Sequence, residues 1–134
     1  MIYTEYISAY LEEANYSHEE PHALDDLWNR LDAFGNEIPF PERLDKNFSL
    51  KKETFFHIVE ILMLHGHLRL AKKGQFLVGS IDKQLESLKE AFPKSEDSQK
   101  EIGGISTWFF MDDCPAGAVW VYQLDDGKEY LEWT

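Results

Sequence analysis

Residues 107–133, TWFFMDDCPAGAVWVYQLDDGKEYLEW, decide the fold class. They contain three runs rich in aromatic and β-branched residues, 107–110, 118–122 and 128–133, and such residues favour strands. Turn-forming residues separate the runs at 112–117 and again at Asp125-Asp126-Gly127. This alternation predicts a C-terminal antiparallel meander of three strands.

The chain upstream of this tail has the apolar spacing of helices. About four are predicted: one from Ile2 to Glu13, one starting at Pro21, one N-capped by Ser49 and ended by Gly66, and one N-capped by Ser80 and ended before Pro93. The second helix should bury one face, with Gly35 closing it; that face comprises Leu24, Leu27, Trp28 and Leu31. Helices followed by strands indicate an α+β fold.

A short hairpin is predicted between the third and fourth helices. Residues 67–70 and 75–78 flank Lys72-Lys73-Gly74, which has the composition of a tight turn. The expected organisation is a single domain over residues 1–134, with a helical part at about 1–93, a polar surface loop at 94–101 and a β-rich tail at 102–134.

Composition predicts a soluble protein with a real core, since 43% of residues are hydrophobic and 14% aromatic. The single cysteine, and a start without the basic and apolar segments of a signal peptide, favour the cytoplasm. No membrane role is expected, because no apolar run approaches the roughly 20 residues of a membrane span. A homo-oligomer is left open.

The net charge of −12 makes basic partners the easier expectation and nucleic acid an unlikely one. The exception is the segment from Arg43 to Lys73, with seven basic and three acidic residues. Its pattern of helix, glycine, strand, Lys72-Lys73-Gly74 and strand is similar to part of a winged helix. Since two lysines cannot offset the charge of the whole domain, we expect both to lie at a solvated hairpin tip.

Candidate catalytic and metal-binding groups are few. His18 and His22 are four residues apart, but a zinc site needs three or four protein ligands. His65 and His67 suit the C-terminal end of a helix. Cys114 follows two acids, Asp112 and Asp113, which should raise the pKa of its thiol, so a structural role is expected. No enzyme activity, catalytic residue, metal or cofactor is predicted.

The tail is the predicted partner-binding surface, because three of the four tryptophans lie in the last 27 residues. Alternation places Trp120 and Tyr122 on one sheet face and Val119 and Val121 on the other. Either one face is free for a partner or both are buried. The proposed surface combines aromatic anchors with an acidic rim suited to a basic partner; it comprises Trp120, Tyr122, Asp112, Asp113, Asp125, Asp126, Glu129 and Glu132.

Several of these motifs resemble a known family. The most specific is the run Cys114-Pro115-Ala116-Gly117-Ala118-Val119-Trp120, supported by Gly79-Ser80-Ile81, Trp108-Phe109-Phe110 and Glu132-Trp133. From Leu27 onward the chain resembles the domain-of-unknown-function family five-nine-six, small bacterial proteins without established activity. Members are often encoded near secreted toxins of contact-dependent or two-partner systems.

The resemblance implies an immunity-type protein that binds and neutralises a cognate toxin domain without catalysis. The alternatives are a nucleic-acid-binding module of winged-helix type, another protein-interaction module and, third, an enzyme whose residues converge only in space.

Overall fold

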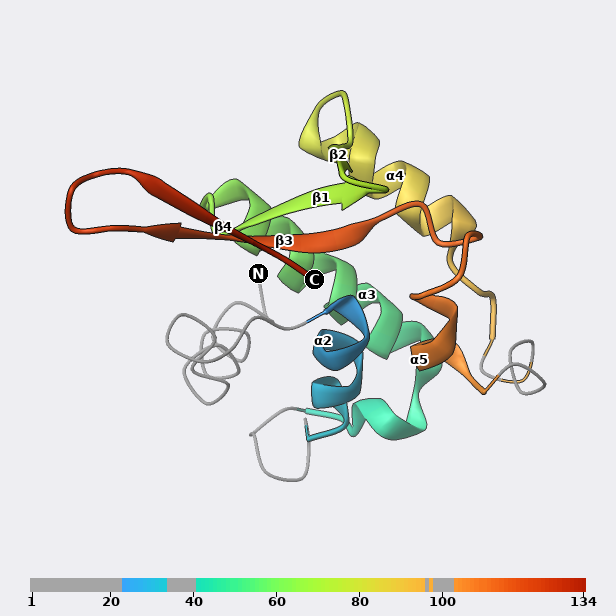
Figure 1. Ribbon diagram of the computed structural model, residues 1–134. Helices are drawn as coiled ribbons and strands as arrows, with labels where there is room; N and C mark the ends of the chain where they lie inside the picture. The colour runs from blue at the N-terminus through green and yellow to red at the C-terminus, as the bar shows by residue number, and fades with distance from the viewer. Residues whose placement is uncertain (1–22, 34–40, 96, 98–102) are drawn as a thin grey trace.

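The computed structural model describes residues 23–33, 41–95, 97 and 103–134 (Figure 1). Several sequence expectations lie outside these residues. They are the helix from Ile2 to Glu13, the roles given to Pro21 and Gly35, the histidine pair His18 and His22, and most of the polar loop at 94–101.

The longest helix among the described residues, α3 (Phe48–Leu64), begins two residues earlier than predicted. Its N-cap is Asn47, whose side-chain oxygen accepts a hydrogen bond from the Leu50 amide at 3.0 Å, so Ser49 is not the cap. The C-terminal prediction is confirmed. Gly66 has φ of 76°, and the His67 amide donates to the Leu62 carbonyl at 2.9 Å, which closes a Schellman motif.

The other helices are shorter. They are α2 (Leu24–Arg30), the 3₁₀ turns η1 (Leu31–Ala33) and η2 (Leu44–Lys46), α4 (Ile81–Ala91) and α5 (Ile105–Trp108). Ser80 caps α4 as predicted, accepting a hydrogen bond from the Lys83 amide at 3.2 Å. Within the described residues, no helix is long and apolar enough to cross a membrane.

Within the described ranges, the sheet has four antiparallel strands in the order β2-β1-β3-β4. Their bounds are β1 (Leu68–Lys72), β2 (Gln75–Phe76), β3 (Gly117–Gln123) and β4 (Glu129–Trp133). The predicted hairpin is therefore confirmed as β1–β2. It joins the C-terminal hairpin β3–β4 in one sheet, and the α+β class is confirmed with four strands where the sequence suggested a meander of three.

The segment 107–110 is not the first strand of the meander. Residues 105–108 form α5, and Phe110 continues the helical turn by donating its amide hydrogen bond to the Thr107 carbonyl at 3.0 Å. Ile105, Trp108 and Phe109 are buried while Phe110 is exposed. This is the i, i+3, i+4 spacing of a helix face, and the aromatic composition concealed it. Strand β1 takes the place beside β3 that the segment was expected to fill.

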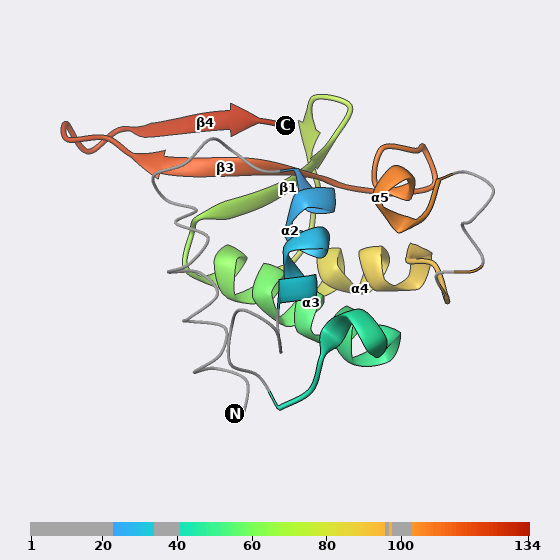
Figure 2. The ribbon, with the colours of Figure 1, turned by 90° about the horizontal axis from the view of Figure 1, so that it is seen from below.

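The helices pack on one face of the sheet (Figures 1 and 2). In register, Leu68 faces Trp120 and Leu70 faces Ala118, and all four side chains belong to the buried core. Phe92, just after α4, lies at the centre of the aromatic part of this core. Among the described residues, six ring centroids lie within 6.4 Å of its own: Trp28, Phe48, Phe55, Phe56, Trp108 and Phe109.

An ion pair between a buried lysine and a half-exposed aspartate joins α3 to η1, which directly follows α2. Lys51 is only 5% exposed, and its ammonium lies 2.9 Å from a carboxylate oxygen of Asp32 and 4.2 Å from the centre of the Trp28 ring. A nearly buried lysine requires such compensation. The predicted inner face of α2 is confirmed, because Leu24, Leu27, Trp28 and Leu31 are all buried.

Candidate protein-binding site

The β3–β4 hairpin, residues 117–133, extends beyond the end of the helical layer, and both views show its tip projecting from the molecule (Figures 1 and 2). Its tip is a tight turn. The Gly127 amide donates to the Leu124 carbonyl at 2.9 Å, and the Lys128 amide donates to a carboxylate oxygen of Asp126 at 3.0 Å. Glycine suits this turn because φ at Gly127 is 82°.

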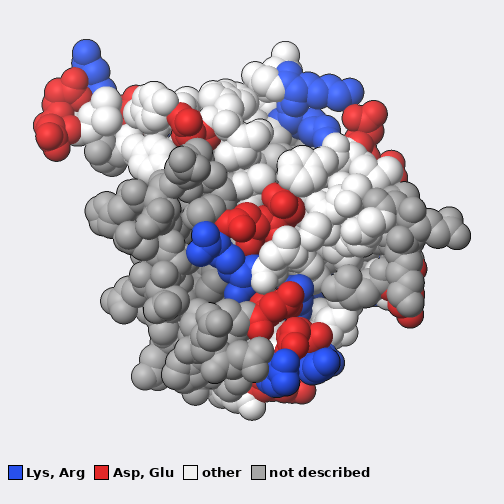
Figure 3. Space-filling view, turned by 60° about the horizontal axis from the view of Figure 1, so that its bottom comes forward, with Lys and Arg blue, Asp and Glu red and all other residues white. Residues whose placement is uncertain are grey.

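The hairpin is acidic. Between Leu124 and Trp133 it carries four acids, Asp125, Asp126, Glu129 and Glu132, against Lys128 alone. Figure 3 shows red and blue atoms clustered at the projecting tip, apart from the mixed charges elsewhere on this face. Asp125, Asp126 and Glu129 are exposed, while Glu132 is partly buried. Three of the four acids of the hairpin are therefore accessible to a partner, two of them at its tip.

On the sheet face away from the helices, side chains of all four strands form one layer. The rings of Phe76 and Trp133 lie 5.1 Å apart, the Arg69 guanidinium lies 5.5 Å from the Phe76 ring, and Arg69 bonds a carboxylate oxygen of Glu129 at 3.1 Å. Val119 lies between Arg69 and Trp133 in register and is buried. Phe76 and Trp133 remain partly exposed, so the layer presents aromatic edges to solvent.

The opposite face of the hairpin carries two tyrosines and a glutamate. The Tyr130 hydroxyl donates to a carboxylate oxygen of Glu132 at 2.5 Å, and the rings of Tyr122 and Tyr130 lie 6.3 Å apart. This hydrogen bond and the negative charge of Glu132 raise the pKa of Tyr130. Burial, with a further contribution from Glu132, raises the pKa of Tyr122. Both phenols therefore stay neutral at physiological pH.

Trp120 is not available to a partner. It is 2% exposed and packs in the core opposite Leu68, so its predicted role as an interface anchor is wrong. Tyr122 is only partly buried and packs against the core. Val119 and Val121 on the other face are also buried. The alternative in which both faces of this strand are buried is therefore the correct one for β3, because β3 is an inner strand of the sheet.

Asp112 and Asp113 do not join the hairpin acids. They are exposed in the turn between α5 and β3, whereas Asp125 and Asp126 lie beyond the other end of β3 (Figure 1). A strand of this length separates its ends by roughly 20 Å. The single acidic ring predicted from sequence is thus two separate groups.

Lys72 does not lie at a solvated tip. Its ammonium donates to the carbonyl oxygens of Cys114 at 2.6 Å and Met111 at 3.2 Å, while Lys73 is exposed. Cys114 is fully buried, and its thiol donates to the Ala116 carbonyl at 3.2 Å. Burial is the main cause that raises the pKa of this thiol, and the aspartates are not among the causes. The pKa of the thiol is therefore raised as expected, but burial raises it and not the two aspartates.

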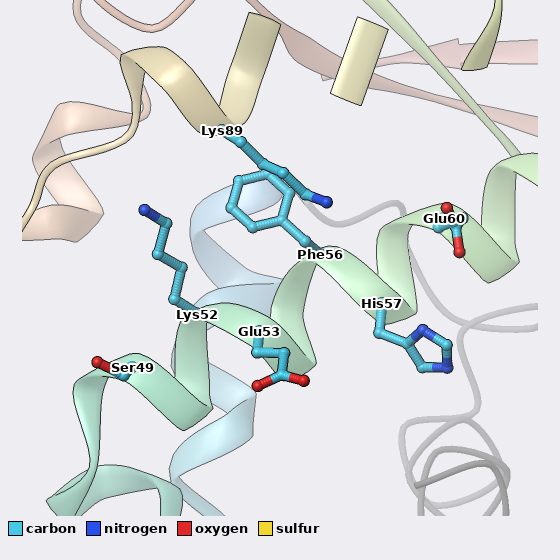
Figure 4. A pocket seen from close by; sticks show the side chains of 7 residues that line it. All are labelled: Ser49, Lys52, Glu53, Phe56, His57, Glu60 and Lys89. Carbon is cyan, nitrogen blue, oxygen red and sulfur yellow. The ribbon is translucent and has the colours of Figure 1, made fainter. Parts of the chain in front are cut away.

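A groove of about 420 Å³ lies between α3 and α4. Six residues of α3 between Ser49 and Glu60 line it, together with Lys89 of α4. Lys89 reaches across the Phe56 ring, with its ammonium 5.6 Å from the ring centre, while Glu53, His57 and Glu60 point in separate directions (Figure 4). The ionisable groups do not converge on a common point. Across the described part of the chain, no three metal-binding side chains come together.

Sequence reasoning missed the accessible aromatic residues of the site. Tyr130 and Trp133 are 51% and 46% exposed and flank the acids of β4. The order of strands was needed to find them, since β4 at the edge is more exposed than β3 in the interior. One signal was present in the sequence: Glu129 and Glu132 interrupt the apolar and aromatic residues of β4, whereas residues 118–122 of β3 contain no charged residue.

Comparisons with known proteins give a family and a related structure. The family model described as "Protein of unknown function, DUF596" matches residues 63–134, from the end of α3 through the whole sheet. A solved structure of an uncharacterised protein conserved in bacteria, from Neisseria meningitidis, superposes with a TM-score of 0.71 and 26% sequence identity. The match covers 96% of this chain and 88% of that one. No curated protein matches.

Proposed function

We propose that this chain, which belongs to the DUF596 family of proteins of unknown function, is a non-catalytic protein-binding domain that neutralises a cognate bacterial toxin domain. The toxin domain is basic, and the β3–β4 hairpin is the surface that binds it. The observation that carries the proposal is the projecting acidic hairpin, which combines exposed carboxylates with the partly exposed rings of Tyr130 and Trp133.

The charges of the hairpin support rapid and selective association. Asp125 and Asp126 lie at its tip, where a basic partner meets them first. Long-range attraction between opposite charges raises the association rate, and dissolved salt weakens it. The whole chain adds to this field, because its net charge is −12.

The aromatic residues of β4 support a lasting contact. Tyrosine and tryptophan are enriched among residues that dominate binding energy. Trp133 is held by the Phe76 ring and Tyr130 by the Glu132 carboxylate, so both side chains are ordered before a partner arrives. Binding therefore costs less side-chain entropy. Neutralisation follows if the bound hairpin covers the toxin's active surface.

The family resemblance supports the identity of the partner class. Proteins of this family are expected beside genes for secreted toxins, and a producing cell needs a binding protein for each toxin it makes. Blocking a toxin requires only a complementary surface. An acidic domain whose described residues hold no metal-binding cluster fits that task.

The test is the binding kinetics of this chain with the purified C-terminal domain of the large secreted protein encoded nearest to its gene. Asp125→Lys with Asp126→Lys should lower the association rate constant about tenfold at low salt, and the difference should shrink as salt rises. The matched control is Glu86→Lys with Glu90→Lys on α4, which changes net charge equally at exposed positions. Equal loss in both pairs would show that net charge alone matters and that the hairpin is not the site.

A further inference from the structure

Strand β4 forms one edge of the sheet, since the order is β2-β1-β3-β4. A strand at an edge has unpaired backbone donors and acceptors along one side. Figure 2 shows β4 at the margin of the molecule, away from α3 and α4. The other edge strand, β2, has only two residues, whereas β4 has five.

Backbone hydrogen bonds identify which groups of β4 are free. The Val121 amide donates toward β1, to the His67 carbonyl at 2.9 Å, so the flanking residues of β3 direct their backbone groups toward β4. On the β4 side, the Thr134 amide donates to the Ala118 carbonyl at 3.2 Å. Even-numbered residues of β4 therefore bond to β3, and the backbone groups of Glu129, Leu131 and Trp133 point away from it.

These three residues leave their outward groups unused. Within the part of the chain that the structure describes, no backbone hydrogen bond is made to the amide or carbonyl of Glu129, Leu131 or Trp133. They provide three donors and three acceptors over about 14 Å of strand. This is the pattern that an additional strand requires.

Side chains along β4 define the chemistry of such a strand. Leu131 and Trp133 lie on the outer sheet face, where the Trp133 ring contacts Phe76, and they favour apolar residues opposite them. Glu132 lies on the other face and favours a basic residue. Glu129 is half exposed and pairs with Arg69, and its exposed side accommodates a second basic residue.

We propose that β4 binds an extended basic segment of its partner as a fifth, antiparallel strand of the sheet. This inference rests on the proposed function and specifies how the hairpin recognises a basic protein. From its N-terminal end, the segment passes along β4 from Trp133 to Glu129. Its five residues in this order are apolar, basic, apolar, unrestricted and basic. Arginine suits the fourth position, over the exposed Tyr130 ring.

The charge of β4 favours this occupant over a second copy of the chain. Two copies paired along β4 would bring together two hairpins with four acids and one lysine each, from chains that carry −12 each. Repulsion between like charges opposes that pairing. A basic strand instead neutralises Glu132 and approaches Asp125 and Asp126 at the turn.

The experiment uses the full chain and a cyclic hairpin peptide with one strand of sequence Val-Lys-Val-Arg-Lys. Backbone amide exchange is followed residue by residue by NMR. We expect the amides of Glu129, Leu131 and Trp133 to exchange rapidly in the free protein and to become protected with peptide, while those of Tyr130 and Glu132 are protected throughout. A peptide N-methylated along its pairing edge should bind at least about tenfold more weakly, because each methyl group removes a donor.

A pair of variants tests the same edge from the protein side. Leu131→Pro removes only an outward amide, which an edge strand tolerates, and should weaken peptide binding about tenfold. Leu131→Thr keeps the amide and should bind nearly as wild type. If Leu131→Pro fails to fold, the N-methylated peptide decides the question alone.

Three outcomes would overturn the inference. The first is absence of peptide binding, and the second is binding that leaves the amides of Glu129, Leu131 and Trp133 unprotected. The third is protection of these amides in the protein alone at high concentration, which would assign the edge to a second copy. If the toxin domain binds but these amides stay unprotected, strand addition fails and the proposed function stands. If the peptide binds and the toxin domain does not, the proposed function fails.

Discussion

The ammonium nitrogen of Lys72 lies 2.6 Å from the carbonyl oxygen of Cys114 and donates a hydrogen bond to it. A second bond to the Met111 carbonyl ties the end of β1 to the turn that precedes β3. The side chain is partly buried. It donates hydrogen bonds to two carbonyl oxygens of a turn whose residues do not pair with a strand. Lys72 is therefore a structural residue, which also removes one of the two lysines that a DNA-contacting wing would use.

Replacing Lys72 with Met should lower the free energy of unfolding by about 2 kcal/mol, because two bonds from a charged donor are lost. Lys73→Met is the matched control, since Lys73 is exposed, and it should change stability by less than about 0.5 kcal/mol. Urea unfolding measures both. Equal stability of the two variants would contradict the structural role of Lys72.

Stability at alkaline pH depends on Cys114. Burial raises the pKa of its thiol above the ordinary value of 9.0, so the folded chain keeps the proton to a higher pH than the unfolded chain does. Above pH 9.0 the unfolded state holds fewer protons, and the free energy of unfolding falls as pH rises, by at most about 1.4 kcal/mol per unit.

Cys114→Ala removes this titration. Its stability should fall less steeply than that of wild type above pH 9.0, with both proteins retaining the contribution of the tyrosines. Chemical unfolding at several pH values gives the two slopes. Parallel slopes would show that the thiol titrates alike in the folded and unfolded chains.

The two tryptophans of the C-terminal hairpin should respond differently to truncation. Trp120→Ala should cost about 3–5 kcal/mol of stability, because it leaves a cavity opposite Leu68 in the core. Trp133→Ala should cost about 1 kcal/mol, since the ring is 46% exposed and its main ring contact is Phe76. Thermal unfolding followed by circular dichroism compares them. A larger loss at Trp133 would reverse the assignment of core and surface.

Local signals allowed much of the fold to be predicted. Ser80 as a cap, Gly66 as a helix stop and the turn at residues 72–74 depend on nearby residues, and the structure has each of them. The segment 107–110 was misassigned because aromatic residues favour strands on average. In this chain the rings of Trp108 and Phe109 pack around Phe92, a contact with a residue far away in the sequence.

Part of the candidate site could be predicted from local signals, and the rest depends on contacts between segments that are far apart in the sequence. Alternation along residues 119–122 correctly separated the two faces of β3, but no local pattern shows that β3 is an inner strand. Burial of Trp120, the exposure of Trp133 and the separation of Asp112 from Asp125 all follow from strand order. That order depends on β1, nearly 50 residues upstream of β3.

The most direct test of the proposed function is survival of bacteria that produce the toxin domain encoded beside this chain's gene. Co-production of the chain, or of its Glu86→Lys, Glu90→Lys variant, should restore colony formation. The hairpin variant Asp125→Lys, Asp126→Lys, produced to the same level and folded, should protect substantially less. Absence of protection by the wild-type chain, with both proteins present in the cell, would contradict the account.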